Sequence, residues 1–291
     1  MPASRSRTEQ WRDCLKKVHE RNGAIEITID RSVEGGESAG SDVVWRCRLV
    51  AIAPTHLVVE PPAAFGAAIN IEPGVRLVGA MTIGQNRWMF HTSTLGYAGV
   101  RPGERTLQLS LPDRVERCTR RGFFRISTAN LRLAYVQCWP LLDPSSVAAA
   151  EAANRAEISD LIAGVTQSNA LPDSAAPDPT ILPEVGPCFK AQLLNVSGGG
   201  LGLLVAPEDA AALNSRSYVW TRLDLRPHIP APVALTARIA HTHIDSGQNV
   251  YAGLAFDFAH NPSHRKFVVD LFSQYIDALQ REQRQANRQA A

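Results

Sequence analysis

A cluster of arginines in the middle of the chain is the first feature that could do chemistry. Five arginines lie between Arg114 and Arg125, and this stretch contains no lysine. A guanidinium group can pair with two acceptors of a guanine edge or a phosphate and can stack on a purine, whereas an ammonium group cannot. The segment therefore predicts a site for an anionic, purine-rich ligand. The arginines that we expect to bind it are Arg120, Arg121 and Arg125, assisted by Arg117.

A second polar segment follows about seventy residues later. It contains Asn195, Ser197 and three consecutive glycines at 198–200. The short Asn and Ser side chains can bond a guanine edge or stabilise their own turn. The glycines remove side chains where a base or a backbone must come close, and they permit positive φ. Because the runs 191–194 and 201–205 are typical of short strands, we expect a strand–turn–strand platform under the arginine segment.

Together and in this order, the two segments resemble the RxxxR and [D/N]xSxxG signatures of PilZ domains, which are bacterial receptors for cyclic di-GMP. Asn stands at the first position of the second signature, where Asp is commoner. The resemblance implies that the arginines bind guanine edges and phosphates of cyclic di-GMP while the turn holds a guanine against a barrel. The ligand-binding residues implied are Arg117, Arg120, Arg121, Arg125, Asn195, Ser197, Gly199 and Gly200.

A β-rich region precedes the arginines. Its strand-like runs, separated by Gly, Pro and Asn turns, are 24–29, 43–52, 56–60, 74–81, 87–94 and 105–111. Short strands at such intervals predict a small β-barrel or sandwich. This arrangement resembles the N-terminal domain of YcgR-like flagellar brake proteins, in which a barrel precedes a PilZ domain across an arginine-bearing junction. Before it, Trp11, Leu15 and Val18 are spaced for one face of a helix over 8–22.

The region after the turn continues the PilZ-like pattern. Its strand-like runs are 217–225, 233–241 and 249–258. A closing amphipathic helix is predicted over 262–285, with Phe267, Leu271, Tyr275 and Leu279 on one face.

An insertion at about 140–187 departs from the compact PilZ pattern. A helix is predicted over 145–163, and the five prolines in 168–187 predict an irregular linker. Two interpretations of the insertion are a surface for a partner and a surface embellishment of the barrel, and we expect the embellishment.

The fold class predicted is mainly β, with two β-barrel domains, an N-terminal helix, a helical or irregular insertion and a C-terminal helix. The expected organisation is an N-terminal helix (1–22), a YcgR-like barrel (23–112), an arginine-rich arm (113–125), a PilZ domain (126–285) and a tail (286–291).

Composition describes a protein with a substantial core, since 45% of its 291 residues are hydrophobic and 20% are charged. The net charge of +2 is too small for bulk nucleic-acid binding. No apolar run is long enough to span a membrane, and the polar N-terminus is unlike a signal peptide. The five cysteines form no CxxC pair, which favours a reducing cytoplasm over a disulfide frame or a zinc site.

No catalytic constellation is present in the sequence. His241 and His243 have a spacing that can bind zinc on one strand face, but a solvated role is favoured. Ser197 lacks the GxSxG elbow of hydrolases, and the glycines 198–200 lack the Lys-Ser/Thr of a phosphate-binding loop. We therefore expect a binding protein without enzymatic activity, metal or cofactor.

The resemblance implies a cytoplasmic cyclic di-GMP receptor that changes its interdomain arrangement to regulate motility, through flagellar motor or switch proteins, or biofilm-type behaviour. Two alternatives stay open: a ligand-free PilZ-like scaffold acting through protein contacts, and a nucleic-acid-binding barrel in which Phe123, Phe124 or Trp88 stacks on bases. The sequence also leaves open a monomer or a homodimer, and one bound ligand or an intercalated pair.

Overall fold

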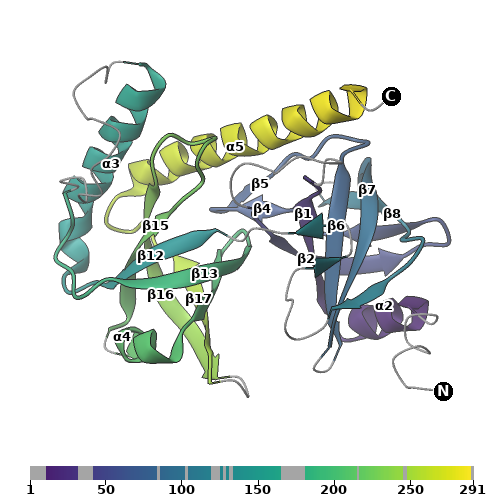
Figure 1. Cartoon of the computed structure of the whole chain (residues 1–291), viewed down its shortest axis with the longest axis horizontal. Helices are drawn as coiled ribbons and strands as arrows, with labels where there is room; N and C mark the ends of the chain where they lie inside the picture. Colours follow the sequence, from purple (N-terminus) through teal and green to yellow (C-terminus); the bar gives the residue numbers. More distant parts are fainter. Residues whose placement is uncertain are drawn as a thin grey trace. The chain divides into compact units, whose positions relative to one another are not determined.

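A computed structural model gives the fold of the chain (Figure 1). The residues that it describes are 11–31, 42–83, 86–101, 104–118, 125–126, 129–130, 134–164, 181–214, 216–244 and 248–289. They belong to two units. The first comprises residues 1–132, 195–198 and 276–291, and the second comprises residues 133–194 and 199–275.

The first unit is built on a closed barrel. Its strands are β1 (Ala24–Ile29), β2 (Trp45–Ile52), β3 (His56–Val59), β6 (Arg76–Ile83), β7 (Asn86–Arg101) and β8 (Glu104–Ser110). They pair in the order β1-β6-β7-β8-β3-β2, and β1 also pairs with β2, which closes the barrel. Two short strands, β4 (Ala63–Ala64) and β5 (Ala67–Ala68), form a separate hairpin. A further short strand, β9 (Glu116–Cys118), pairs with β7.

Alternation along the strands fills this barrel. In β2, Trp45, Cys47 and Leu49 are buried while Arg46 and Arg48 are exposed, because successive side chains of a strand point to opposite faces. The other strands of the barrel also direct buried side chains inward, and together these side chains form the core.

Two helical segments complete the first unit. Helix α2 (Trp11–Glu20) buries Cys14, Leu15 and Val18 and lies at one end of the barrel (Figure 1). The residues of helix α5 (Pro262–Gln289) that belong to this unit contribute two buried glutamines. Gln283 bonds both backbone groups of Arg76 at 2.8 and 2.9 Å, so its amide side chain continues the hydrogen bonding of β6.

The second unit contains another closed barrel. Its strands are β12 (Tyr135–Pro140), β13 (Phe189–Val196), β14 (Gly200–Val205), β15 (Tyr218–Leu223), β16 (Val233–Ile244) and β17 (Val250–Phe256). They pair in the order β13-β12-β15-β16-β17-β14, and β13 also pairs with β14. A short helix, α4 (Ala210–Asn214), follows β14. The first half of α5 adds the buried residues Leu271 and Tyr275.

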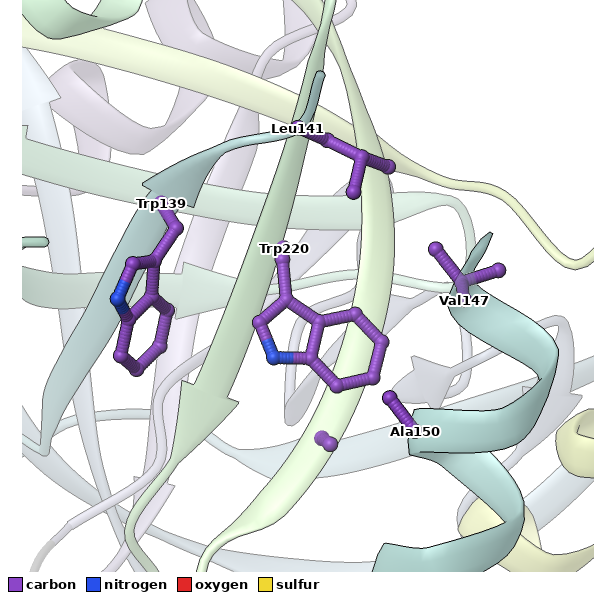
Figure 2. Packing of buried hydrophobic residues seen from close by; sticks show 6 residues of the cluster. Trp139, Leu141, Val147, Ala150 and Trp220 are labelled. Atoms are coloured by element: carbon purple, nitrogen blue, oxygen red, sulfur yellow. The ribbon is translucent and has the colours of Figure 1, made fainter. Parts of the chain in front are cut away.

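The insertion contributes to the core of the second unit, which corrects the expectation of a surface embellishment. Helix α3 (Val147–Ile162) packs Val147 and Ala150 against Leu141 and Trp220 (Figure 2). Residues 165–180, which include most of the predicted linker, lie outside the described residues.

Polar side chains also anchor α3 to the barrel. The side chain of Asn154 donates to the carbonyl of Pro232 at 2.9 Å and accepts from the N–H of Ala234 at 2.8 Å. Glu151 accepts a hydrogen bond from the Thr236 hydroxyl at 2.9 Å. The sequence pattern missed these contacts because they place polar residues on the buried face of the helix.

The predicted fold class is confirmed: the protein is mainly β, with two closed barrels and the expected N-terminal, insertion and C-terminal helices. Helix α5 continues to Gln289, beyond the predicted end at residue 285, and its polar residues 280 and 283 bond to the first barrel. No helix in the described part of the chain is long and apolar enough to cross a membrane. The cysteine side chains that the structure describes are free thiols: Cys14, Cys47, Cys138 and Cys188.

Candidate functional site

The predicted strand–turn–strand is present: β13 and β14 are connected by a turn at residues 197–199. In this turn, the carbonyl groups of Gly198 and Gly199 both accept backbone hydrogen bonds. The N–H of Gly66, at the tip of the β4–β5 hairpin, donates to Gly198 at 2.6 Å. The N–H of Phe256, at the end of β17, donates to Gly199 at 3.0 Å. Each of these two bonds lies within one unit, the Gly198 bond in the first and the Gly199 bond in the second.

The three glycines of the turn have different roles. A Cβ atom at Gly200 would lie 1.8 Å from the carbonyl oxygen of Leu254, so this position admits no side chain. At Gly198 a Cβ would meet the Cβ of Ala63 at 3.2 Å. At Gly199, which is exposed, a Cβ would meet nothing within 4 Å. Of the three glycines, Gly199 is therefore the one at which an added side chain would meet no neighbouring atom.

The three glycines permit positive φ, but none of them adopts it. The described glycines with positive φ are Gly66, Gly74, Gly96 and Gly164, and residues 198–200 are not among them. Close approach of strand β17, not a left-handed backbone, requires glycine at position 200.

Asn195 is held by a carboxylate from the first barrel strand. Its Nδ2 donates to Oε1 of Glu26 at 3.0 Å, and Oε2 of Glu26 forms an ion pair with Arg87 on β7. The side chains of Arg87 and Glu26 are 17% and 19% exposed, so water screens this pair only partly. All three residues belong to the first unit. We call Glu26, Arg87 and Asn195 the Glu26 network.

The start of the arginine arm lies beside the Glu26 network. Strand β9 pairs with β7 so that Cys118 is opposite Arg87 and Arg117 is opposite Trp88. Adjacent strands are about 4.8 Å apart, so the backbone of the arm passes next to Arg87. The structure thus brings the first predicted ligand residue, Arg117, and the turn residue Asn195 to one neighbourhood of the first unit.

The remaining arm residues are described only in part. Arg125 lies in the two-residue strand β10 (Arg125–Ile126), opposite Asn130 of β11 (Ala129–Asn130). For Arg117 and Arg125 the structure describes the backbone alone, and Arg120 and Arg121 lie outside the described residues. Ser197 is half-buried in the turn. The arginine contacts with a ligand therefore stay a prediction.

Sequence reasoning missed Glu26 and Arg87. Glu26 occupies an ordinary outward position in an alternating strand, and Arg87 is one of many polar residues at strand ends. Their pairing with each other and with Asn195 is a product of the barrel topology, which no local pattern encodes.

Two other predicted features change in the structure. Trp88 is 1% exposed, so it is not available to stack on a base, and this corrects one element of the nucleic-acid alternative. Phe123 and Phe124 lie outside the described residues. The exposed His243 stacks on Tyr251, with ring centroids 4.8 Å apart, and no group of three or more potential metal ligands occurs among the described residues.

No protein-family model and no curated protein matches the chain. Among solved structures, the chain is similar to Escherichia coli YcgR in complex with c-di-GMP, with 13% identity over 96% of this chain and 93% of that one and a TM-score of 0.29. It is similar to K. pneumonia MrkH in its apo state, with 11% identity over 93% of each chain and a TM-score of 0.31. A third such structure is the Bacillus subtilis inhibitor of motility MotI/DgrA, with 12% identity, 88% and 97% coverage and a TM-score of 0.29.

YcgR is thus among the structures that this chain resembles, as the sequence predicts.

Proposed function

We propose that the chain is a receptor for cyclic di-GMP and not an enzyme. The observation that carries the proposal is the turn at 197–199. Position 200 excludes any side chain, and a Cβ at position 199 meets nothing within 4 Å. Asn195, in the strand before the turn, bonds to Glu26, whose partner Arg87 lies opposite the start of the arginine arm. Such a turn can accept a guanine base against a backbone without side chains. The RxxxR segment supplies the cations that a ligand with two phosphodiester groups requires.

The proposed ligand contacts of each residue follow from the chemistry of its side chain or backbone. Arg120, Arg121 and Arg125, assisted by Arg117, bind guanine edges and phosphates, since guanidinium groups make bidentate contacts with both. The residues that hold one guanine at the turn are Asn195, Ser197, Gly199 and Gly200.

The proposed output is a change in the arrangement of two domains, a barrel domain at 23–112 and a PilZ domain at 126–285, joined by the arm at 113–125. Ligand shifts this arrangement because it binds one arrangement more tightly than the other. The change regulates motility through flagellar motor or switch proteins, or biofilm-type behaviour, in the cytoplasm. The protein acts as a monomer or a homodimer.

Isothermal titration of the full chain with cyclic di-GMP, with GTP as the control ligand, tests the proposal. We expect cyclic di-GMP to bind and GTP to give no signal. Arg121→Ala and Arg125→Ala should each weaken binding by about 2–5 kcal/mol, since each removes one partner of a charged contact.

The matched control is Arg114→Ala. Arg114 belongs to the same arginine-rich segment but is exposed and pairs with Glu116, so its removal should leave affinity nearly unchanged. Absence of cyclic di-GMP binding by the native chain would exclude the proposed function. If both Arg121→Ala and Arg125→Ala kept the native affinity, the proposed function would stand but the assigned binding site would be rejected.

A further inference from the structure

The hydrogen bond between Asn195 and Glu26 fixes which atom of the asparagine a ligand can meet. An asparagine side chain carries an acceptor oxygen and a donor NH2 group, and the two are easily interchanged by rotation of the amide. An ionised carboxylate only accepts hydrogen bonds. The group of Asn195 that contacts Glu26 must therefore be the NH2 group, as the 3.0 Å contact from Nδ2 to Oε1 has it.

This orientation leaves Oδ1 of Asn195 as the free end of the amide. The pairing edge of guanine offers two neighbouring donors, N1–H and N2–H, which require an acceptor. An aspartate at this position would present an acceptor to the base in any rotation, whereas an asparagine presents its oxygen only when its NH2 group is directed elsewhere. In this chain Glu26 holds it.

Arg87 makes the carboxylate of Glu26 compatible with a nearby anionic ligand. An unpaired carboxylate beside a site for a ligand with two phosphates would repel the ligand, and the repulsion would be strong where the side chains are largely shielded from water. The ion pair with Arg87 neutralises Glu26. Arg87 in turn lies opposite Cys118 in the strand that leads into the arginine arm.

We propose that Glu26 is a positioning residue for guanine recognition, which orients the amide of Asn195 so that its oxygen accepts from the base, while Arg87 keeps Glu26 compatible with an anionic ligand. This inference rests on the proposed cyclic di-GMP function and assigns to that site a residue from the first barrel strand. In effect, the pair of Asn195 and Glu26 does what a single aspartate does in the commoner form of the turn.

The test is a double-mutant cycle with cyclic di-GMP titrated into the full chain. Glu26→Gln loses the ion pair and lets the Asn195 amide rotate, so affinity should fall about tenfold, the equivalent of one good hydrogen bond. Asn195→Asp alone places two carboxylates within hydrogen-bond distance, and it should also weaken binding. The double variant should bind more tightly than either single variant, because the new amide at position 26 can donate to one oxygen of the new carboxylate at position 195 and leave the other oxygen for guanine.

Rescue in the double variant is a result that a merely structural role does not produce. The matched control is Glu72→Gln, which breaks another Glu–Arg pair of the first unit, with Arg284, and should leave affinity unchanged. Thermal unfolding of each variant verifies that the chain is folded.

Additive losses in the double variant, or native affinity in Glu26→Gln, would overturn the inference. Either result, obtained with a native chain that binds cyclic di-GMP and an Arg121→Ala variant that does not, would leave the proposed function standing. Absence of binding by the native chain would instead remove the function itself.

Discussion

Two glutamates, one in each unit, accept a hydrogen bond from a polar side chain, yet their surroundings differ. Glu26 lies on the outer side of the first barrel, accepts from Asn195 and has a cation, Arg87, as its partner. Glu151 lies on α3, is 1% exposed and accepts from Thr236. Burial, together with the nearby Asp257 and against opposing hydrogen bonds from Thr236 and Asn261, raises the pKa of Glu151 to about 7.

This difference distinguishes Glu26, for which we propose a role in ligand recognition, from Glu151, which has a structural role. A carboxylate that is paired with a cation and only partly shielded from water, such as Glu26, can orient a neighbouring side chain for ligand binding. A carboxylate that is buried without such compensation gives up its charge near neutral pH. We therefore expect changes around Glu151 to act on stability and changes around the turn to act on affinity.

The largest effect that this contrast predicts is on stability, from Asn154→Ala. The substitution leaves the buried N–H of Ala234 and the carbonyl of Pro232 without their partner, so the free energy of unfolding should fall by about 3–4 kcal/mol. Urea denaturation measures it. Asp160→Ala, at an exposed site on the same helix, is the control and should change stability by less than about 0.5 kcal/mol. Equal effects of the two substitutions would mean that α3 is not anchored to the barrel.

The next effect concerns pH. The folded-state pKa of Glu151, about 7, lies above the ordinary value of 4.5, so the folded protein holds the extra proton between these values and its stability falls as pH rises from 4.5 to 7. Glu151→Gln stays neutral and can still accept from Thr236. At about pH 8 it should therefore be more stable than the native chain by about 2–3 kcal/mol, with the difference disappearing below about pH 4.5.

Urea denaturation of both proteins across this pH range gives the difference directly, and Asp160→Asn serves as an exposed control. Parallel pH curves for the native chain and Glu151→Gln would show that Glu151 keeps its charge, and the contrast with Glu26 would fail.

The smallest stability effect is expected at the turn. Gly199→Ala introduces a methyl group that meets nothing within 4 Å, so the free energy of unfolding should change by less than about 0.5 kcal/mol. The same methyl group occupies the open space proposed for the base, so affinity for cyclic di-GMP should fall. Calorimetric titration and thermal unfolding of one preparation measure both quantities. Full affinity in this variant would place the ligand away from the turn.

Strand alternation predicted both barrels and located the turn between β13 and β14, because burial of one face of a strand imposes a period of two. The partners of the site were not predictable. Asn195 and Glu26 are 169 residues apart, and their contact depends on how β1 is placed in the closed barrel.

The requirement at Gly200 was predicted as close approach, but its cause, the carbonyl of Leu254, is also a tertiary neighbour. On α3, the residues that face the barrel include Glu151 and Asn154, so an apolar stripe could not identify the buried face. In each case the missing information is a distant partner that makes a polar residue or a glycine acceptable at its position.

The amide of Gln283 has a consequence for the order in which the protein is made. Arg76 lies in a strand of the first barrel, and its backbone groups are completed by a side chain that is translated 207 residues later. Gln280 makes the same kind of connection to Glu72 and Asn70. On the ribosome, the first barrel therefore reaches its full set of hydrogen bonds only after Gln280 and Gln283 have emerged. A deletion that removes these two glutamines should accordingly destabilise the first barrel.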